Sequence, residues 1–312
     1  MKDLHESEKG ILILDSGDLL FKKYLNPLSE NELKGVREKA HLIIEGFNLT
    51  GYDAIGIGDD DLTLGKEFLL ENLKKANFPF LSSNLLDEGS GNILFQSSLI
   101  KEINGFRIGI FSLLSPDLFT GPSDPRRKGL IVRSPIETAQ AMIKELKPKT
   151  DLIILLSHLG YAKDIDLAQT VQGINIIIGG HNGVHFVIPP VIKDTLILQM
   201  ASRGMFGGRL TLIFYNNEPI FYNSAIKLSL ENNLNNFNQR LKAKDTTEAE
   251  KAQWRKAKEE TERTLNQLHG KNNFINHIIP LQEQMKEHPD IKRLVENFKG
   301  QFPGAKTISS PQ

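Results

Sequence analysis

Acidic and imidazole side chains stand at four places in this sequence where a short apolar run ends. The segments are "DSGDLLF" (15–21), "GIGDDDL" (56–62), "LLSHLG" (155–160) and "GGHNGVHF" (179–186). The possible donors are Asp18, Asp59, Asp60, Asp61, His158, His181 and His185. Carboxylate and imidazole without thiolate suit manganese, iron, zinc or similar divalent ions. Hydrolytic sites with two metals use such ligands to hold a phosphoryl group and to activate water.

Each of these residues also has a purely structural interpretation. An aspartate after a strand and a glycine often forms a turn or caps a helix. His158 and His181 could each be a histidine that is hydrogen-bonded at a strand end. Because the two histidines end consecutive predicted strands, we favour a shared polar site over coincidence.

The elements that position these residues are predicted from apolar patterning. Continuous apolar runs predict buried strands at 11–15, 53–57, 151–157 and 174–180. Open α/β sheets place their sites at the carboxyl ends of strands, so the four segments are expected to meet.

The rest of the chain up to residue 228 alternates between strand and helix patterns. Ser29 and Glu32 have capping-box spacing, and Asn104-Gly105 is the sequence of a two-residue hairpin turn. Helices are expected at 29–51, 64–76, 135–146 and 162–171, a hairpin at 97–114, an extended segment at 78–84, and strands at 195–200, 208–215 and 221–228. The alternation predicts a layered α/β fold.

The composition changes near residue 229, where the chain becomes polar and helical. Asp245-Thr246-Thr247-Glu248 is typical of a helix start, and a second helix is expected at about 290–299. We therefore predict a main domain over 1–228 and a helical C-terminal extension over 229–312. The extension is expected to be solvent-exposed and to be a possible surface for a protein partner.

Composition excludes several classes of function. Among 312 residues, Lys+Arg and Asp+Glu number 38 each, so the basic excess typical of nucleic-acid binding is missing. The absence of cysteine excludes disulfides, zinc–thiolate sites and cysteine nucleophiles. No apolar stretch is long enough to span a membrane, and "MKDLHESEKG" lacks the pattern of a signal peptide. As written, the sequence predicts a soluble cytoplasmic protein, or a periplasmic one if an export signal has been removed.

Five segments carry a resemblance to a known family. They are "LDSGDLLF", "GYDAIGIGDDDL", "SSNL", "LLSHLGYAKDIDLAQTVQGINIIIGGHNG" and "LQMASRGMFGGRLTL", which lie within residues 11–215. In order and spacing they resemble the N-terminal catalytic domain of the 5′-nucleotidase and UDP-sugar hydrolase family of calcineurin-like metallophosphoesterases. The resemblance implies a layered β-sandwich flanked by helices and a site for two metal ions.

Three metal ligands implied by the resemblance are intact. Asp18 matches the metal-bridging aspartate, His158 matches the ligand of the Ser-His-Leu-Gly motif, and His181 matches the first ligand of the Gly-Gly-His motif. Asp59 stands where the family has a ligand asparagine, and its carboxylate can still bind a metal. We therefore predict Asp18, Asp59, His158 and His181 as the ligands of one or two ions of manganese, iron or zinc.

Other positions depart from the family pattern. Asp60 replaces the catalytic histidine and is the candidate catalytic residue, although its charge would repel phosphate oxygens. Asp61 replaces a glutamate, and Thr63 replaces the aspartate that orients the histidine. Gly183 stands at the last ligand position, with His185 two residues further on.

The first metal motif of the family has no clear counterpart. Asp3-Leu4-His5 looks like it, but the chain is too short there for the strand before the motif and the helix after it. We expect the first strand and motif to be missing.

Three functions remain open at this point. The first is a divergent metal-dependent phosphoester hydrolase with weak or altered activity, acting on a small phosphorylated molecule. The second is a pseudoenzyme that keeps the fold as a binding or interaction module. The third is a cation-binding protein without turnover. The C-terminal nucleotide-binding domain of the family has no equivalent in residues 229–312, so nucleotide specificity is not carried over.

Overall fold

The computed structural model divides into two compact units. The first unit consists of residues 1–207 and 279–312, and the second consists of residues 208–278. The residues that the structure describes are 10–22, 28–200, 204–243, 245, 247–282 and 284–303. The predicted boundary at residue 228 lies within the second unit and stays a prediction.

The larger sheet of the first unit has six strands in the order β10-β11-β9-β8-β6-β5. They are β5 (Ser98–Ile103), β6 (Phe106–Leu114), β8 (Leu152–His158), β9 (Ile176–Gly179), β10 (Val191–Ile192) and β11 (Thr195–Gln199). The central strands β6, β8, β9 and β11 run parallel, and β8 is buried along its whole length. The β5–β6 hairpin turns at Asn104 and Gly105, whose φ angles of 50° and 82° confirm the predicted turn.

A smaller parallel sheet packs against this one. Its strands are β1 (Leu14–Asp15), β2 (Ala54–Gly56) and β3 (Phe80–Leu81), in that order. A Cβ at Gly56 would lie 2.6 Å from Ser112 Oγ on β6, so a larger residue would hold the two sheets apart. A short antiparallel pair, β4 (Leu85–Asp87) with β7 (Leu130–Val132), completes the layered sandwich.

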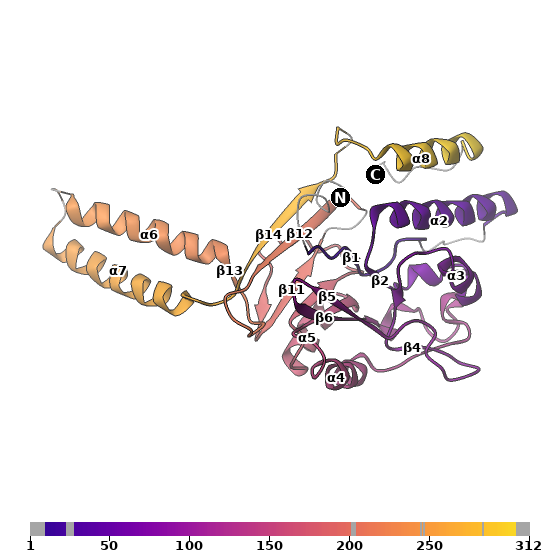
Figure 1. Ribbon diagram of the computed structural model, residues 1–312, viewed down its shortest axis with the longest axis horizontal. Helices are drawn as coiled ribbons and strands as arrows, with labels where there is room; N and C mark the ends of the chain where they lie inside the picture. The colour runs from indigo at the N-terminus through magenta and orange to yellow at the C-terminus, as the bar shows by residue number, and fades with distance from the viewer. Residues whose placement is uncertain are drawn as a thin grey trace. The chain divides into compact units, whose positions relative to one another are not determined.

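Helices cover both sheets. Buried side chains of α2 (Glu30–Thr50) and α3 (Lys66–Leu73) join a cluster with the smaller sheet. Those of α4 (Pro135–Leu146) and α5 (Tyr161–Thr170) join a cluster with the larger sheet. The predicted capping box at the start of α2 is present, and Gly51 ends that helix with a φ angle of 78°. Helix α8 (Pro289–Gln301) lies beside α2 (Figure 1).

The second unit contains a helical hairpin. Helices α6 (Ser224–Lys242) and α7 (Glu248–Leu268) lie side by side in Figure 1 and bury no residue fully. The ring of Trp254 on α7 stacks on Phe237 of α6 at 5.7 Å between centroids. A three-stranded sheet has the order β12-β14-β13, with β12 at Phe206–Ile213, β13 at Tyr222–Asn223 and β14 at Asn273–Pro280.

The predicted layered α/β sandwich is confirmed, while the strand predicted over 221–228 is wrong beyond Asn223. Helix α6 starts at Ser224 because Asn223 caps it, its side chain accepting a hydrogen bond from the Ala225 N–H. Strand β14 was not predicted, and it lies within the segment expected to be a helical extension. Within the described ranges, no helix combines the length and apolar character that crossing a bilayer requires.

Candidate metal centre

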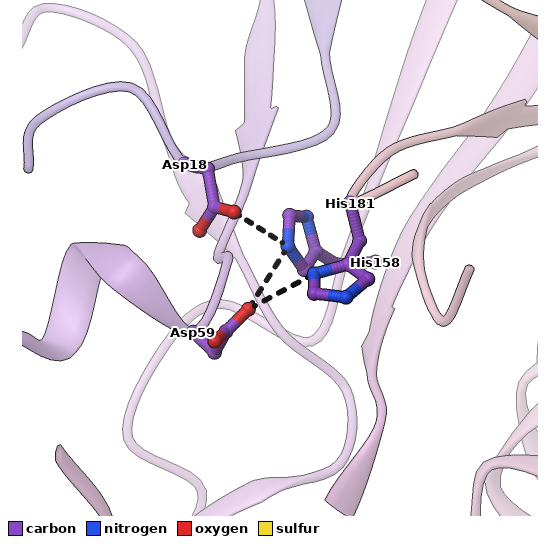
Figure 2. Close-up of side chains that lie close together, drawn as sticks. All are labelled: Asp18, Asp59, His158 and His181. Atoms are coloured by element: carbon purple, nitrogen blue, oxygen red, sulfur yellow. Dashed lines mark ion pairs between the residues drawn. The ribbon is translucent and has the colours of Figure 1, made fainter. Parts of the chain in front are cut away.

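Four predicted ligands meet at the carboxyl ends of strands from both sheets. Asp18 follows β1, Asp59 follows β2, His158 ends β8, and His181 follows β9. Figure 2 shows the two carboxylates and the two imidazoles turned toward one another. One ligand atom from each residue lies within 4.8 Å of all the others. In the part of the chain that the structure describes, no other group of three or more His, Asp or Glu side chains has this geometry.

The imidazole of His158 lies between the two carboxylates. Its Nε2 is 3.0 Å from Asp18 Oδ2 and 3.3 Å from Asp59 Oδ1. On its other side, Nδ1 lies 2.7 Å from the carbonyl oxygen of Ser16, which can only accept a hydrogen bond. The backbone therefore places the proton of the neutral ring on Nδ1 and leaves Nε2 as the ligand atom. Nδ1 of His181 lies 3.4 Å from Asp59 Oδ1.

The cluster fits a single divalent ion. Asp59 Oδ1 and His158 Nε2 are buried and, among the residues that the structure describes, have no partner in hydrogen-bonding geometry. Buried polar atoms without a partner are costly and call for an explanation such as a missing ion. Two carboxylate oxygens and two imidazole nitrogens are a donor set that manganese, iron and zinc accept.

Charge inside the cluster shifts the pKa values of two of these groups. Burial alone would lower the pKa of His158, but the facing carboxylates of Asp18 and Asp59 raise it to about 10. Burial alone would raise the pKa of Asp59, yet the two imidazoles and Arg126 hold it well below its usual range. A metal ion would take the place of the proton on His158 and keep the carboxylates ionised.

Asp61 supports the cluster from behind. Its buried carboxylate accepts backbone hydrogen bonds from Asp18 and Gly58 at Oδ2 and from Leu19 and Leu20 at Oδ1. These contacts tie the loop after β1 to the loop after β2. Burial, together with the charge of Asp18, raises the pKa of Asp61.

Glycine permits the close contact between these two loops. An ideal Cβ at Gly58 would lie 2.2 Å from Asp18 Oδ1. Gly17 has a φ angle of 100°, and its Cβ would lie 2.3 Å from the backbone nitrogen of Gly58. Asp18 itself has a φ angle of 62°, a conformation that aspartate tolerates better than most residues. Its Oδ1 accepts a hydrogen bond from the Asp60 N–H at 2.8 Å.

A buried arginine that sequence reasoning missed lies beside the cluster. Arg126 is 5 % exposed, and its Nη1 contacts Asp59 Oδ2 and lies 2.9 Å from Asp60 Oδ1. Its Nε and Nη2 donate to the two oxygens of Asp124 at 3.1 and 2.8 Å. The only sequence signal is the pair Arg126-Arg127 after Asp124-Pro125, which is equally typical of a surface loop.

Asp164 on α5 is a second buried acid that the sequence analysis did not single out. It accepts a hydrogen bond from Ser157 Oγ, next to His158 in β8. An ideal Cβ at Gly179 would lie 2.6 Å from Asp164 Oδ2, so α5 packs directly on the strand that leads to His181. Burial raises the pKa of Asp164 to about 7.

The remaining candidate residues take other places. Asp60 lies at the edge of the cluster, and its carboxylate forms an ion pair with Arg126. His185 does not join the four ligands, since its ring packs on Phe206 with 4.9 Å between centroids. Thr63 donates a hydrogen bond to the carbonyl of Lys22 at 3.4 Å. Asp3 and His5 lie outside the described residues.

Comparison with known proteins identifies relatives by sequence. No protein-family model matches the chain. A 5′-nucleotidase of Diplobatis ommata is 28 % identical over 258 residues, which cover 72 % of this chain and 43 % of that protein. A 5′-nucleotidase of Vibrio cholerae is 27 % identical, and the alignment covers 69 % of this chain and 43 % of that protein. The chain thus spans less than half the length of these relatives.

Solved structures show the same fold. Sulfate thiohydrolase SoxB of Thermus thermophilus aligns with a TM-score of 0.67 at 18 % identity, covering 94 % of this chain and 43 % of that one. A 5′-nucleotidase precursor of Thermus thermophilus aligns with a TM-score of 0.66 at 21 % identity, and the alignment covers 97 % of this chain and 52 % of that one. The calcineurin-like phosphoesterase YfkN of Bacillus subtilis aligns with a TM-score of 0.60 at 18 % identity, and the alignment covers 93 % of this chain and 83 % of that one. The predicted resemblance and fold class are confirmed.

Proposed function

We propose that this chain, a relative of the 5′-nucleotidases with a calcineurin-like phosphoesterase fold, is a divergent metal-dependent phosphoester hydrolase. One observation carries the proposal. Asp18, Asp59, His158 and His181 converge from four separate strand ends, and two of their ligand atoms are buried without a hydrogen-bond partner among the described residues. These two atoms lie 3.3 Å apart as an ion pair within the cluster, an interaction that a bound divalent ion would replace by binding both.

Some residues of the cluster would bind the ion, and others hold these ligands in place. Asp18, Asp59, His158 and His181 would hold a manganese, iron or zinc ion, which supplies Lewis acidity toward a phosphoryl oxygen and a more acidic bound water. The Ser16 carbonyl keeps His158 Nε2 aimed at the cluster, and the contacts of Asp61 keep Asp18 in place.

Asp60 is the proposed catalytic residue at the edge of the cluster. Its ion pair with Arg126 makes it a proton acceptor rather than a proton donor. A carboxylate cannot supply the positive charge of the histidine that the family resemblance places there. We therefore expect slow turnover, lower by about 10²–10⁴ than with a positioned acid at this site.

The substrate class proposed is a small phosphorylated molecule. The relatives are named as 5′-nucleotidases, and this chain covers 43 % of their length. The family resemblance puts recognition of the base outside the domain that this chain matches. The first substrates to test are thus simple aryl phosphate monoesters and diesters.

The test compares hydrolysis with metal binding in one set of proteins. Metal-free protein is loaded with Mn²⁺, Fe²⁺ or Zn²⁺ and assayed on p-nitrophenyl phosphate and bis-p-nitrophenyl phosphate. We expect metal-dependent hydrolysis that is lost in His158→Ala/His181→Ala and retained in His185→Ala, because His185 lies outside the cluster. Bound metal without hydrolysis would instead indicate a cation-binding protein. A protein that neither binds metal nor hydrolyses these esters would indicate an interaction module.

A further inference from the structure

We infer that Arg126 is a built-in cation that neutralises Asp59, Asp60 and Asp124, so that these carboxylates bind no second ion and the cluster holds one divalent ion per chain. The inference rests on the proposed function, because it specifies the composition of the same centre. It makes Arg126 a positioning residue, which acts on the centre through the carboxylate of Asp59.

Asp59 connects the two positive charges. Its Oδ2 contacts Arg126 Nη1, while its Oδ1 faces His158 and His181 at 3.3 and 3.4 Å. One oxygen is thus committed to the guanidinium and the other to the ligand cluster. An ion bound to Oδ1 would leave Asp59 as a bridge between a metal on one side and an arginine on the other.

The surroundings of Arg126 form a complete anionic site. Asp59, Asp60 and Asp124 all contact its guanidinium, and Asp124 does so through two nitrogens. Nη2 also donates to the Leu118 carbonyl at 3.1 Å, and the guanidinium lies 5.5 Å from the centre of the Phe119 ring. Three carboxylates gathered this closely require a cation, and here the chain itself provides it.

Arginine differs from a metal ion in ways that matter at this position. It stays protonated at any ordinary pH and cannot dissociate, so the charge beside Asp59 is permanent. At 5 % exposure it is too buried to contact a substrate directly. Its effect is therefore on ion binding, since it neutralises carboxylates that would otherwise attract a second ion.

The experiment is a metal titration with three matched variants. Metal-free protein is titrated with Mn²⁺, and bound metal is measured after equilibrium dialysis by elemental analysis. Arg126→Met removes the charge, Arg126→Lys keeps it, and Arg127→Met removes the neighbouring charge, which has no ion pair with Asp59, Asp60 or Asp124. We expect one equivalent in the wild type, Arg126→Lys and Arg127→Met, and a second equivalent in Arg126→Met at saturating Mn²⁺.

Two equivalents in the wild type would overturn the inference and leave the proposed hydrolase intact. A single equivalent in Arg126→Met at saturating Mn²⁺ would also overturn it, because removing the arginine would then not create a second ion site. No bound metal in the wild type would overturn the inference and the proposed function together. The wild-type titration decides the stoichiometry even if Arg126→Met does not fold.

Discussion

Three neighbouring aspartates have three different surroundings. Asp59 faces the imidazoles and Arg126, Asp60 pairs with Arg126 at the edge of the cluster, and Asp61 accepts four backbone hydrogen bonds. Their accumulation after β2 agrees with the rule that buried charges are paired or hydrogen-bonded, with Arg126 shared by Asp59 and Asp60. The sequence predicted that they belong to one loop at the site, but it could not assign their partners.

The carboxylate of Asp61 is expected to be structural and to matter for the metal site. In Asp61→Asn, the amide nitrogen cannot accept a hydrogen bond, so two of the four backbone N–H groups lose their acceptor. We expect a loss of roughly 2–4 kcal/mol in the free energy of unfolding, from the cost of unsatisfied buried donors. Urea denaturation measures this loss, and the exposed Asp194→Asn is the control. Equal stability of the two variants would contradict the structural role.

The Gly58→Ala substitution tests the contact between the two loops. Its Cβ would lie 2.2 Å from Asp18 Oδ1, so Asp18 must move away from the other ligands. We expect metal affinity to fall by at least about tenfold, which corresponds to about 1.4 kcal/mol. Gly46→Ala is the matched control, because nothing lies within 4 Å of its added methyl group. Calorimetric titration with Mn²⁺ gives both affinities, and an unchanged value for Gly58→Ala would show that Asp18 is not a ligand.

At the scale of elements, helix α5 packs against the strands that end at or before the two histidines. Asp164 accepts a hydrogen bond from Ser157 in β8, and it packs against Gly179 of β9. The positive charge of His158 acts on the Asp164 carboxyl group and opposes the rise of its pKa. A buried carboxyl group here makes stability depend on pH.

The pKa of Asp164 is raised from 3.8 to about 7, so it stays protonated in the fold at pH values where the unfolded chain ionises it. Its favourable contribution is full below about pH 4 and declines as the pH rises to about 7. Asp164→Asn keeps a neutral group, so its stability relative to wild type should increase across that window. This change in the free energy of unfolding, relative to wild type, is at most about 4 kcal/mol. Denaturation at pH 4, 5.5 and 7 without metal measures it, with the exposed Asp166→Asn as control, and a constant difference would contradict the burial argument.

Elements with strong local signals were predictable. The capping box of Ser29 with Glu32, the Asn104-Gly105 turn and the proline at the start of α4 each mark a boundary through local chemistry. Strand β14 was missed, and residues 224–228 at the start of helix α6 were predicted as strand, because mixed polar and apolar residues give neither a clear period of two nor one of 3.6. Arg126 was missed for a different reason: its burial depends on Asp124 in its own loop and on Asp59 and Asp60 in a loop more than 60 residues earlier in the sequence.

At the scale of the whole molecule, the ligands and the helical hairpin belong to different units. Asp18, Asp59, His158 and His181 lie in the first unit, and α7 lies in the second. The general rule for α/β sheets predicted that the four strand ends meet, whereas the choice of these four ligands among seven candidate residues came from the family resemblance. The predicted partner surface on the C-terminal helices stays a prediction.

Hydrogen exchange is expected to distinguish the two units. Metal binding should slow exchange of the Leu19, Leu20 and Gly58 amides, because their acceptor Asp61 belongs to the loops that the metal would fix. The amides of α7 should exchange at the same rate with and without metal. Mass spectrometry of wild type beside His158→Ala/His181→Ala checks both statements. Slower exchange in α7 alone would place the metal elsewhere.

The most direct test of the central claim is the anomalous scattering of a crystal soaked in Zn²⁺. Our account predicts one strong peak about 2.0–2.2 Å from the ligand atoms of Asp18, Asp59, His158 and His181. It also predicts that the Arg126 guanidinium remains on Asp59 Oδ2 in the same crystal. A peak elsewhere, or none at this cluster, would show that these four residues do not form the metal centre.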